Sequence, residues 1–272
     1  MEFTKMHGAG NDFIIIRDDT EKLSHEMLSS LARKYCRRRL GLGADGLMVV
    51  RPPQQEGDFR MLFYNADGSM GEMCGNGARC IARYGYEKGL SGETQRIETT
   101  AGLVLGERIN RTQYRVRLND PSVLEIERWA DAGGQRWNCA YVELGDPGIP
   151  HALFELPFDE MDDDALRRLG RELRHASVFP KGANVTFWQQ TAPGRVKVKT
   201  YERGVEDFTL ACGTGCGSLT AALTKAGRCG GQLMLDCPGG TLEVSLRREE
   251  DRIVDILLSG PTCLVAEGIL ME

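Results

Sequence analysis

The sequence predicts an α/β protein of the α+β type, with two pseudo-symmetric halves that each wrap a curved mixed or antiparallel sheet around a central helix. Three observations predict this fold. A Cys-Gly-x-Gly stretch occurs twice, at Cys74–Gly77 and Cys212–Gly215, and a helix-like segment follows each copy. The residues around the two copies match at a nearly constant offset. Each half also has one central helix and about eight short strands, a ratio that disfavours a parallel doubly wound sheet.

The elements of the first half follow from turn signals and periodicity. They are, in order, a strand, loop and strand over 3–17, a helix over 25–37 capped by Ser24, strands over 47–50 and 60–65, a helix over 74–88 and a strand over 114–118. The helix that begins at Cys74 carries mostly small side chains, such as Ala78 and Ala82. A helix of this kind can be surrounded by other elements.

The second half repeats the first. Cys74 and Cys212 are 138 residues apart, and the same offset relates several other pairs. These pairs are Leu28 and Leu166, Leu31 and Leu169, Gly89 and Gly227, and Gly102 and Gly240, while Ala44-Asp45 matches Ala183-Asn184 at 139. An internal duplication is therefore predicted, with halves at residues 1–120 and 121–261 and a C-terminal tail, 262–272, that returns to the first half. The ligand site is expected in the cleft between the halves.

Composition and charge favour a small-molecule partner. The chain has 272 residues, a formal net charge of −5 and a pI near 5.6, with the two signs of charge interspersed. This pattern gives no electrostatic reason to expect binding to nucleic acid or to a membrane surface. The longest apolar runs have the length of strands, and the N-terminus lacks the apolar core of a signal peptide, so a cytoplasmic location is expected.

The nine cysteines are scattered along a long chain, which is not the pattern of a disulfide-rich secreted domain. Reduced thiols are therefore expected. The spacings from Cys74 to Cys80 and from Cys212 to Cys216 differ from the CxxC pairs of structural zinc sites, and no histidine lies nearby. No metal site is predicted.

The position of a cysteine at each helix start suggests its chemistry. Unpaired N–H groups and the helix dipole favour a thiolate there, and the glycines let the same N–H groups approach a substrate carboxylate. A single cysteine is more often a small buried apolar residue. Two such turns facing a carbon acid, however, would place a sulfur on each side of it, as two-base racemisation requires.

Several longer segments make the chain similar to a known family. They are His7–Phe13, Gly43–Gly46, Asn65–Ser69, Met73–Cys80, Pro150–Ala152, Asn184-Val185, Glu202–Gly204 and Ala211–Gly215. On these segments the sequence resembles the diaminopimelate epimerase family, racemases that work without pyridoxal phosphate. The resemblance implies two similar α/β halves, no cofactor, a homodimer, and conversion of LL-2,6-diaminopimelate to the meso isomer in lysine and peptidoglycan precursor synthesis.

The resemblance also implies roles for individual residues. The expected catalytic set is two cysteines with two residues that govern their protonation: Cys74, Cys212, His151 and Glu202. The expected substrate-binding set comprises backbone N–H groups for the reacting carboxylate and polar side chains for the distal end: Gly75, Asn76, Gly213, Thr214, Asn11, Asn65, Asn184 and Arg203. A guanidinium such as that of Arg203 can bind a carboxylate with two hydrogen bonds.

Two departures from the family pattern leave alternatives open. Ile149 stands where an Asn is usual before Pro150-His151, and Phe208 lies in a slightly longer segment where an acidic residue is frequent. Loss of a polar contact can change substrate selectivity sharply. A racemase of another amino acid, such as histidine, is therefore a second hypothesis. A thiol redox protein that uses the two cysteines is a third.

Overall fold

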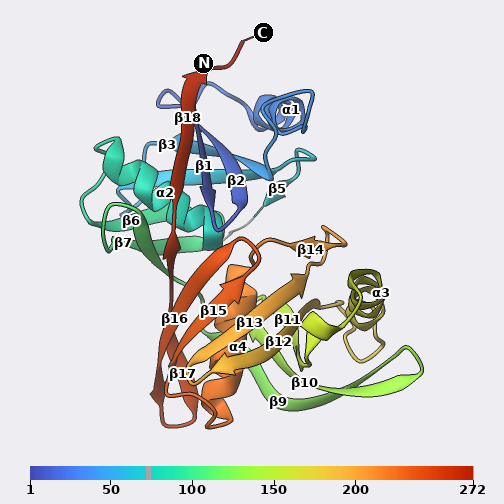
Figure 1. Cartoon of the computed structure of the whole chain (residues 1–272). Helices are drawn as coiled ribbons and strands as arrows, with labels where there is room; N and C mark the ends of the chain where they lie inside the picture. Colours follow the sequence, from blue (N-terminus) through green and yellow to red (C-terminus); the bar gives the residue numbers. More distant parts are fainter. Residues whose placement is uncertain (72–74, 272) are drawn as a thin grey trace. The chain divides into compact units, whose positions relative to one another are not determined.

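The computed structural model describes residues 1–71 and 75–271, and the chain divides into two compact units (Figure 1). Unit 1 comprises Met1–Val116 and Ser259–Glu272, and unit 2 comprises Arg117–Leu258. The chain passes from one unit to the other a few residues before each boundary that the sequence suggested.

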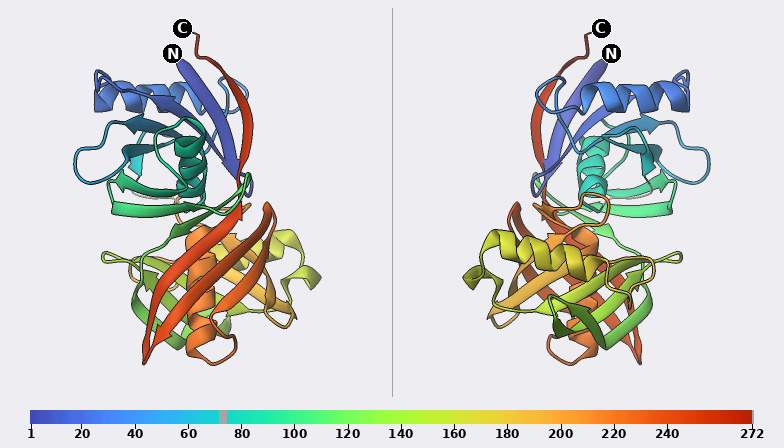
Figure 2. Two further views of the ribbon diagram at one scale, coloured as in Figure 1. Left: turned by 90° about the vertical axis from the view of Figure 1, so that its left-hand side faces the viewer. Right: turned by 90° about the vertical axis from the view of Figure 1, so that its right-hand side faces the viewer.

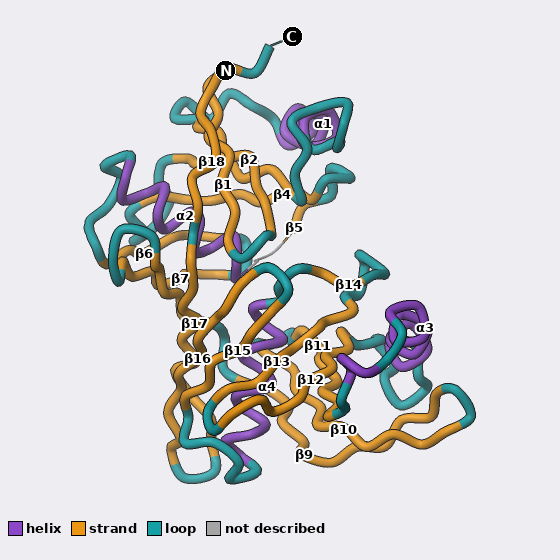
Figure 3. The backbone as a smooth tube through the Cα atoms, in the orientation of Figure 1, coloured by secondary structure: helices purple, strands orange, loops and turns teal. Residues whose placement is uncertain are grey.

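Unit 1 contains two helices, α1 and α2, among short strands (Figure 3). Its elements are β1 (Glu2–Gly8), β2 (Asn11–Arg17), α1 (His25–Tyr35), β3 (Gly46–Arg51), β4 (Phe59–Asn65), β5 (Met70–Gly71), α2 (Gly75–Glu87), β6 (Thr94–Thr99), β7 (Gly102–Arg108), β8 (Gln113–Arg117) and, from the end of the chain, β18 (Cys263–Ile269).

The strands of unit 1 form a mixed sheet. The antiparallel pairs are β18 with β1, β1 with β2, β3 with β4, β6 with β7 and β7 with β8, and short β5 also pairs antiparallel with β4. The pairs β2 with β3 and β4 with β6 are parallel. Each parallel step needs a crossover, and α1 and α2 supply these crossovers. The predicted mixed sheet is confirmed.

The two helices of unit 1 differ in their surroundings. Ser24 caps α1, because its hydroxyl accepts a hydrogen bond of 3.2 Å from the N–H of Met27, and α1 buries one face through Leu28 and Ala32. In contrast, α2 is buried from Gly75 to Gly85 and packs against β1, β2 and β7. Figure 2 shows α2 among the strands of its unit. This arrangement confirms the central helix predicted from the small residues.

Unit 2 contains the elements β9 (Pro121–Ala132), β10 (Gln135–Leu144), β11 (Ile149–Glu155), a 3-10 turn η1 (Phe158–Glu160), α3 (Asp163–Arg174), β12 (Asn184–Ala192), β13 (Arg195–Tyr201), β14 (Phe208–Thr209), α4 (Gly213–Lys225), β15 (Gln232–Cys237), β16 (Gly240–Glu249) and β17 (Arg252–Pro261). Asp162 caps α3 as Ser24 caps α1, with its carboxylate 3.0 Å from the N–H of Ala165. Leu166 and Leu173 of α3 lie in the core of the unit.

The pairing pattern of unit 2 repeats that of unit 1. Antiparallel pairs join β9 with β10, β10 with β11, β12 with β13, and β15 with β16. The pairs β11 with β12 and β13 with β15 are parallel, as are their counterparts in unit 1. The central helices α2 and α4 each have 13 residues. The repeated topology confirms the two similar halves that the sequence predicts.

The closing strand of each sheet comes from a different part of the chain. In unit 2, β9 pairs with β10, which follows it directly. In unit 1 the equivalent place beside β1 is taken by β18, so that Glu2 lies opposite Ile269.

Among the helices of the described residues, none is both long and apolar enough to cross a membrane.

Candidate active site

Several of the predicted site residues lie around the N-terminal ends of the central helices α2 and α4. Cys74, which precedes Gly75 in the sequence, lies outside the described residues. The site residues of each unit are therefore described around the helix of that unit.

Cys212 directly precedes the first turn of α4. Its backbone is extended, with φ −116° and ψ 104°, and its carbonyl accepts the hydrogen bond of 3.0 Å from the N–H of Cys216 that starts the helix. The side chain is buried. Gly213 and Gly215 leave the first turn without bulky side chains, so the N–H groups of Gly213 and Thr214 can approach an anion.

His151 lies in β11, opposite Asn184 of the parallel strand β12, and is fully buried. Its Nε2 lies 3.0 Å from Thr214 Oγ1 and 3.5 Å from Asn184 Nδ2. Burial, together with the positive charge of Arg203, lowers the pKa of His151 to about 3. The imidazole is therefore neutral at physiological pH.

The orientation of the Asn184 amide determines which nitrogen of His151 carries the proton. The backbone N–H of Arg203 donates to Asn184 Oδ1 over 2.8 Å, so the other amide atom, Nδ2, faces the imidazole. Because an amide NH₂ can only donate, His151 Nε2 accepts and the proton sits on Nδ1. Within the described part of the chain, the buried Nδ1 has no hydrogen-bond partner.

A side chain at position 215 would contact both His151 and Cys212. A Cβ built on Gly215 would lie 3.4 Å from His151 Nδ1 and 3.4 Å from Cys212 Sγ. The nitrogen that carries the proton and the sulfur thus border the same small space, which glycine leaves open.

Cys212 is held as a thiol. Burial raises its pKa well above the ordinary value, and the nearby negative charge of Glu202 raises it further. Hydrogen bonds from the Thr214 hydroxyl, 3.5 Å from Sγ, and from the N–H of Gly215 act in the opposite direction. The helix start therefore favours the thiolate, as the sequence suggested, but burial outweighs this effect and the pKa of Cys212 is raised.

Glu202 is fixed on the turn before β14. Its Oε1 accepts a hydrogen bond of 2.7 Å from the hydroxyl of Thr209, a residue of β14. The carboxylate also takes part in a hydrogen bond with the Cys212 thiol, which favours the protonated sulfur. Glu202 is thus positioned to exchange a proton with Cys212.

Arg203 is exposed, and both its backbone and its side chain form hydrogen bonds with other residues of unit 2. Its backbone N–H donates a hydrogen bond to Asn184 Oδ1, and its Nη1 donates to the carbonyl of Lys181 over 3.1 Å. That bond uses only part of the guanidinium, which has five N–H donors, so others remain available for a carboxylate.

In unit 1, α2 brings Asn76 to Asn11. Asn76 Nδ2 lies 3.4 Å from Asn11 Oδ1, and Asn76 Oδ1 accepts a hydrogen bond of 2.9 Å from Arg79 Nη2. Arg79, one turn into α2, is fully buried, and its Nη1 lies 3.5 Å from the carbonyl of Gly75. The first turn of α2 is therefore linked to Asn11 through side-chain amides.

Asp45 holds the other end of the Asn11 amide. Asn11 Nδ2 donates to Asp45 Oδ2 over 2.6 Å, and the same oxygen accepts the N–H of Asp12 at 3.0 Å. Arg38 Nη2 lies 2.9 Å from the second oxygen of Asp45. Both ends of the Asn11 amide are thus oriented by the protein.

Asn65 is placed separately, at the end of β4. Its Nδ2 donates to Ser69 Oγ over 3.0 Å, within the turn that leads to β5. Ser29 of α1 supports this turn by donating to the carbonyl of Gly68 over 2.6 Å. The described contacts link Asn65 to α1, whereas Asn11 and Asn76 contact each other.

The structure gives a packing role to one of the two departures. Phe208 packs edge-to-face against Tyr201, with ring centroids 5.8 Å apart, and lies 6.3 Å from the ring of Phe187. Its neighbour Asp207 pairs with Arg167 over 2.7 Å. Ile149 begins β11, opposite Leu144, and offers no hydrogen-bonding side chain there.

Three residues that support the site were not singled out from the sequence: Asp45, Arg79 and Thr209. For Asp45 a signal existed, because the offset of 139 pairs it with Asn184, itself a predicted site residue. Thr209 and Arg79 gave no comparable signal, because their contacts depend on how the chain folds around α4 and α2.

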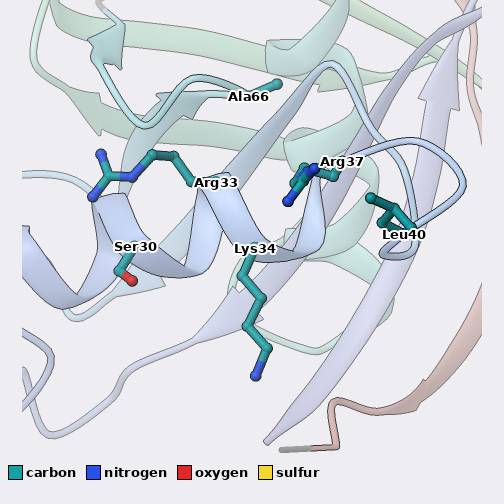
Figure 4. A pocket seen from close by; sticks show the side chains of 6 residues that line it. All are labelled: Ser30, Arg33, Lys34, Arg37, Leu40 and Ala66. Atoms are coloured by element: carbon teal, nitrogen blue, oxygen red, sulfur yellow. The ribbon is translucent and has the colours of Figure 1, made fainter.

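A surface hollow in unit 1 borders α1. It measures about 570 Å³ and is lined by Ser30, Arg33, Lys34, Arg37, Leu40 and Ala66 (Figure 4). The side chains of Arg33 and Lys34 point in different directions there, so their charges do not converge on one point.

Within the described ranges, no three His, Cys, Asp or Glu side chains are arranged to hold a metal ion.

Comparison with known proteins places the chain in a family. The sequence model of the family described as diaminopimelate epimerase matches residues 3–123 and 146–262. The diaminopimelate epimerase of Aquifex aeolicus is 41% identical over 79% of this chain and 78% of its own length. That of Archaeoglobus fulgidus is 36% identical over 98% of this chain and 95% of its own.

Solved structures of lower identity share the fold. A probable proline racemase from Agrobacterium radiobacter matches with a TM-score of 0.75 at 17% identity, covering 99% of this chain and 92% of that one. A hydroxyproline epimerase from Agrobacterium vitis matches with a TM-score of 0.73 at 16% identity, covering 98% and 91%. The matches in sequence extend over both halves, and the chain belongs to the diaminopimelate epimerase family.

Proposed function

We propose that the protein interconverts LL-2,6-diaminopimelate and its meso isomer by a two-base mechanism in which Cys74 and Cys212 exchange protons with the α-carbon. The observation that carries the proposal is the environment of Cys212. It is a buried thiol between the carboxylate of Glu202 and the hydroxyl of Thr214, at the start of a helix. The relatives named as diaminopimelate epimerases support the choice of substrate.

In this mechanism Cys212 enters as the proton donor. Its raised pKa keeps the proton on sulfur until the α-carbon develops negative charge. Cys74, as thiolate, removes the α-proton from the other face of the carbon. For the reverse reaction the roles exchange, because the forward transfer leaves Cys212 as the thiolate and Cys74 as the thiol. Glu202 restores the forward state by passing a proton from solvent to Cys212, while Cys74 releases one.

The reacting carboxylate is assigned to the helix starts. The N–H groups of Gly213 and Thr214, and of Gly75 and Asn76, are the proposed donors. Such donors also stabilise the charge that spreads from the α-carbon into the carboxylate. Asn11, Asn65, Asn184 and Arg203 are proposed to bind the distal amino acid end.

Isotope exchange tests the reaction directly. Reduced protein incubated with LL-2,6-diaminopimelate in heavy water should incorporate deuterium at one α-carbon as the meso isomer forms. The label is read by mass spectrometry and the isomers by chiral chromatography. Absence of both exchange and isomerisation would refute the proposal.

Two cysteine variants test the two-base assignment. Cys74→Ala and Cys212→Ala should each lose inversion by at least about a thousandfold, because a one-sided site cannot return a proton to the opposite face. Cys139→Ala provides the control, since this buried cysteine lies in the core of unit 2. Full activity in either test variant would exclude opposed thiol bases.

Ile149 motivates a second candidate substrate. Its apolar side chain stands where the family usually provides an amide, so the distal end of diaminopimelate loses one expected partner. The candidate is a racemase of another amino acid with the same thiol chemistry. A panel of L-amino acids, histidine included, assayed for deuterium exchange distinguishes the two by relative kcat/KM.

The family resemblance supports further proposals about cellular context. We propose that the reaction proceeds without pyridoxal phosphate, that it serves lysine and peptidoglycan precursor synthesis in the cytoplasm, and that the protein is a homodimer. Activity of protein free of the pyridoxal absorption band tests the first proposal, and light scattering tests the last.

A further inference from the structure

Two thiols outside the proposed catalytic set lie close together in unit 2. Cys216 lies in the first turns of α4, and Cys237 is the last residue of β15. Their Sγ atoms are 3.7 Å apart. The sulfurs are thus at contact distance, roughly 1.7 Å farther apart than in a disulfide bond. Rotation of the two side chains, together with a small shift of α4 or β15, can close that gap.

The two thiols differ in access to solvent. Cys216 is buried at 2% exposure, whereas Cys237 is partly exposed at the end of its strand. A small oxidant therefore reaches Cys237 first, and Cys216 is positioned behind it as a resolving thiol. A partly exposed cysteine next to a buried partner is an arrangement that forms a disulfide in preference to higher oxides.

We propose that Cys216 and Cys237 form a reversible disulfide when the protein meets hydrogen peroxide, and that this disulfide fastens the first turns of α4 to β15. The proposal rests on the geometry of unit 2 alone and stands independently of the proposed function.

The chemistry balances with peroxide as the oxidant. The Cys237 thiol loses its proton and its sulfur attacks one peroxide oxygen, so that the O–O bond breaks and Cys237 becomes a sulfenic acid. The hydroxide released from the peroxide takes up the thiol proton and leaves as water. The sulfur of Cys216 then attacks the sulfenic sulfur, the S–O bond breaks, and the thiol proton leaves with hydroxide as a second water. Two electrons pass from the sulfurs to the peroxide, and a dithiol reductant reverses the product by exchange.

The proposed disulfide would attach close to Cys212, at the start of α4. The N–H of Cys216 donates to the carbonyl of Cys212, so both residues belong to the same start of α4. A covalent bond at Cys216 therefore restrains the first turn of α4, directly after Cys212. The restraint should also raise the Tm by several degrees, because the bond closes a loop between two elements of one unit.

Peptide mapping tests the proposal. Cleavage after Lys and Arg releases peptide 204–225, which contains Cys212 and Cys216, and peptide 229–247, which contains Cys229 and Cys237. After brief peroxide treatment and alkylation, the two peptides should appear joined, two hydrogen atoms lighter than their sum. Dithiothreitol should separate them and return the Tm to that of the reduced protein.

Matched variants assign the pair. Cys216→Ser and Cys237→Ser should each abolish the joined peptide and the rise in Tm, while Cys212→Ala and Cys229→Ser should keep both. Circular dichroism shows whether each variant folds. A joined peptide that survives Cys237→Ser, or that is lost in Cys212→Ala, would assign the bond to other sulfurs and overturn the proposal. Accumulation of sulfinic acid on Cys237 without any joined peptide would overturn it equally.

Discussion

The backbone N–H of Arg203 donates to Asn184 Oδ1 over 2.8 Å, and this bond fixes the protonation pattern of His151. It turns Asn184 Nδ2 toward His151 Nε2, which must then accept. A main-chain group on one turn thus determines which imidazole nitrogen carries a proton in the core of the site.

Asn184→Asp should reverse this pattern. A carboxylate oxygen in place of Nδ2 can only accept, so the imidazole should move its proton to Nε2. Long-range ¹⁵N NMR of the His151 ring should show the Nδ1–H tautomer in the native protein and the Nε2–H tautomer or the imidazolium in the variant. Asn138→Asp, an exposed change on β10, should leave the ring signals unmoved. Identical ring signals in native protein and Asn184→Asp would refute the assignment.

His151 should make stability fall in mild acid. Its folded-state pKa is lowered to about 3, so below the unfolded value near 6.5 only the unfolded chain takes up the proton. The stabilisation is complete above pH 6.5 and declines as pH falls toward 3. Between pH 6.5 and 5 the native protein should lose about 2 kcal/mol more unfolding free energy than His151→Gln. Urea titrations at the two pH values measure the difference, and parallel losses would contradict it.

Glu202→Gln should make Cys212 more acidic. Burial contributes most to the raised pKa and remains in the variant, but the second cause, the carboxylate charge, is removed. Alkylation of Cys212 by iodoacetamide at neutral pH, followed on peptide 204–225, should become several-fold faster. Glu160→Gln, an exposed change, should leave the rate unchanged. A slower reaction in Glu202→Gln would show that the carboxylate activates the thiol.

Asp45→Ala should weaken substrate binding more than it slows turnover. Without the carboxylate, the Asn11 amide loses its bond of 2.6 Å and its fixed orientation. KM for diaminopimelate should rise roughly tenfold while kcat changes less, because Asp45 acts through Asn11, which is proposed to bind the substrate. Asp45→Asn should recover part of the loss. Asp19→Ala, which removes an exposed pair with Arg17, provides the control.

Gly215→Ala should impair catalysis while the fold persists. The new Cβ would lie 3.1 Å from Thr186 Oγ1 and 3.4 Å from both Cys212 Sγ and His151 Nδ1. Turnover should fall by roughly ten- to a hundredfold, since small misplacements of reacting groups are costly. Gly230→Ala meets nothing within 4 Å and should keep full activity. Equal activities in the two variants would show that the space beside Gly215 is not used.

The sequence predicted the elements whose signals are local or repeated. Ser24 marked the start of α1, and the duplicated Cys-Gly turn marked the start of α4 at Gly213. Contacts that depend on distant turns left no such signal. Two examples are the hydrogen bond from Thr209 to Glu202 and the ion pair of Asp45 with Arg38. Each joins residues that only the folded chain brings together, so no periodicity in the sequence predicts it.

The pairing of β1 with β18 has a consequence for the order in which the protein is made. Unit 2 is one continuous stretch, Arg117–Leu258, so the half that contains His151 and Cys212 can complete its sheet during synthesis. Unit 1 begins first but lacks the neighbour of β1 until residues 263–269 leave the ribosome. The half that contains Asn11 and Asn76 therefore completes its sheet last, although its first strand is synthesised first.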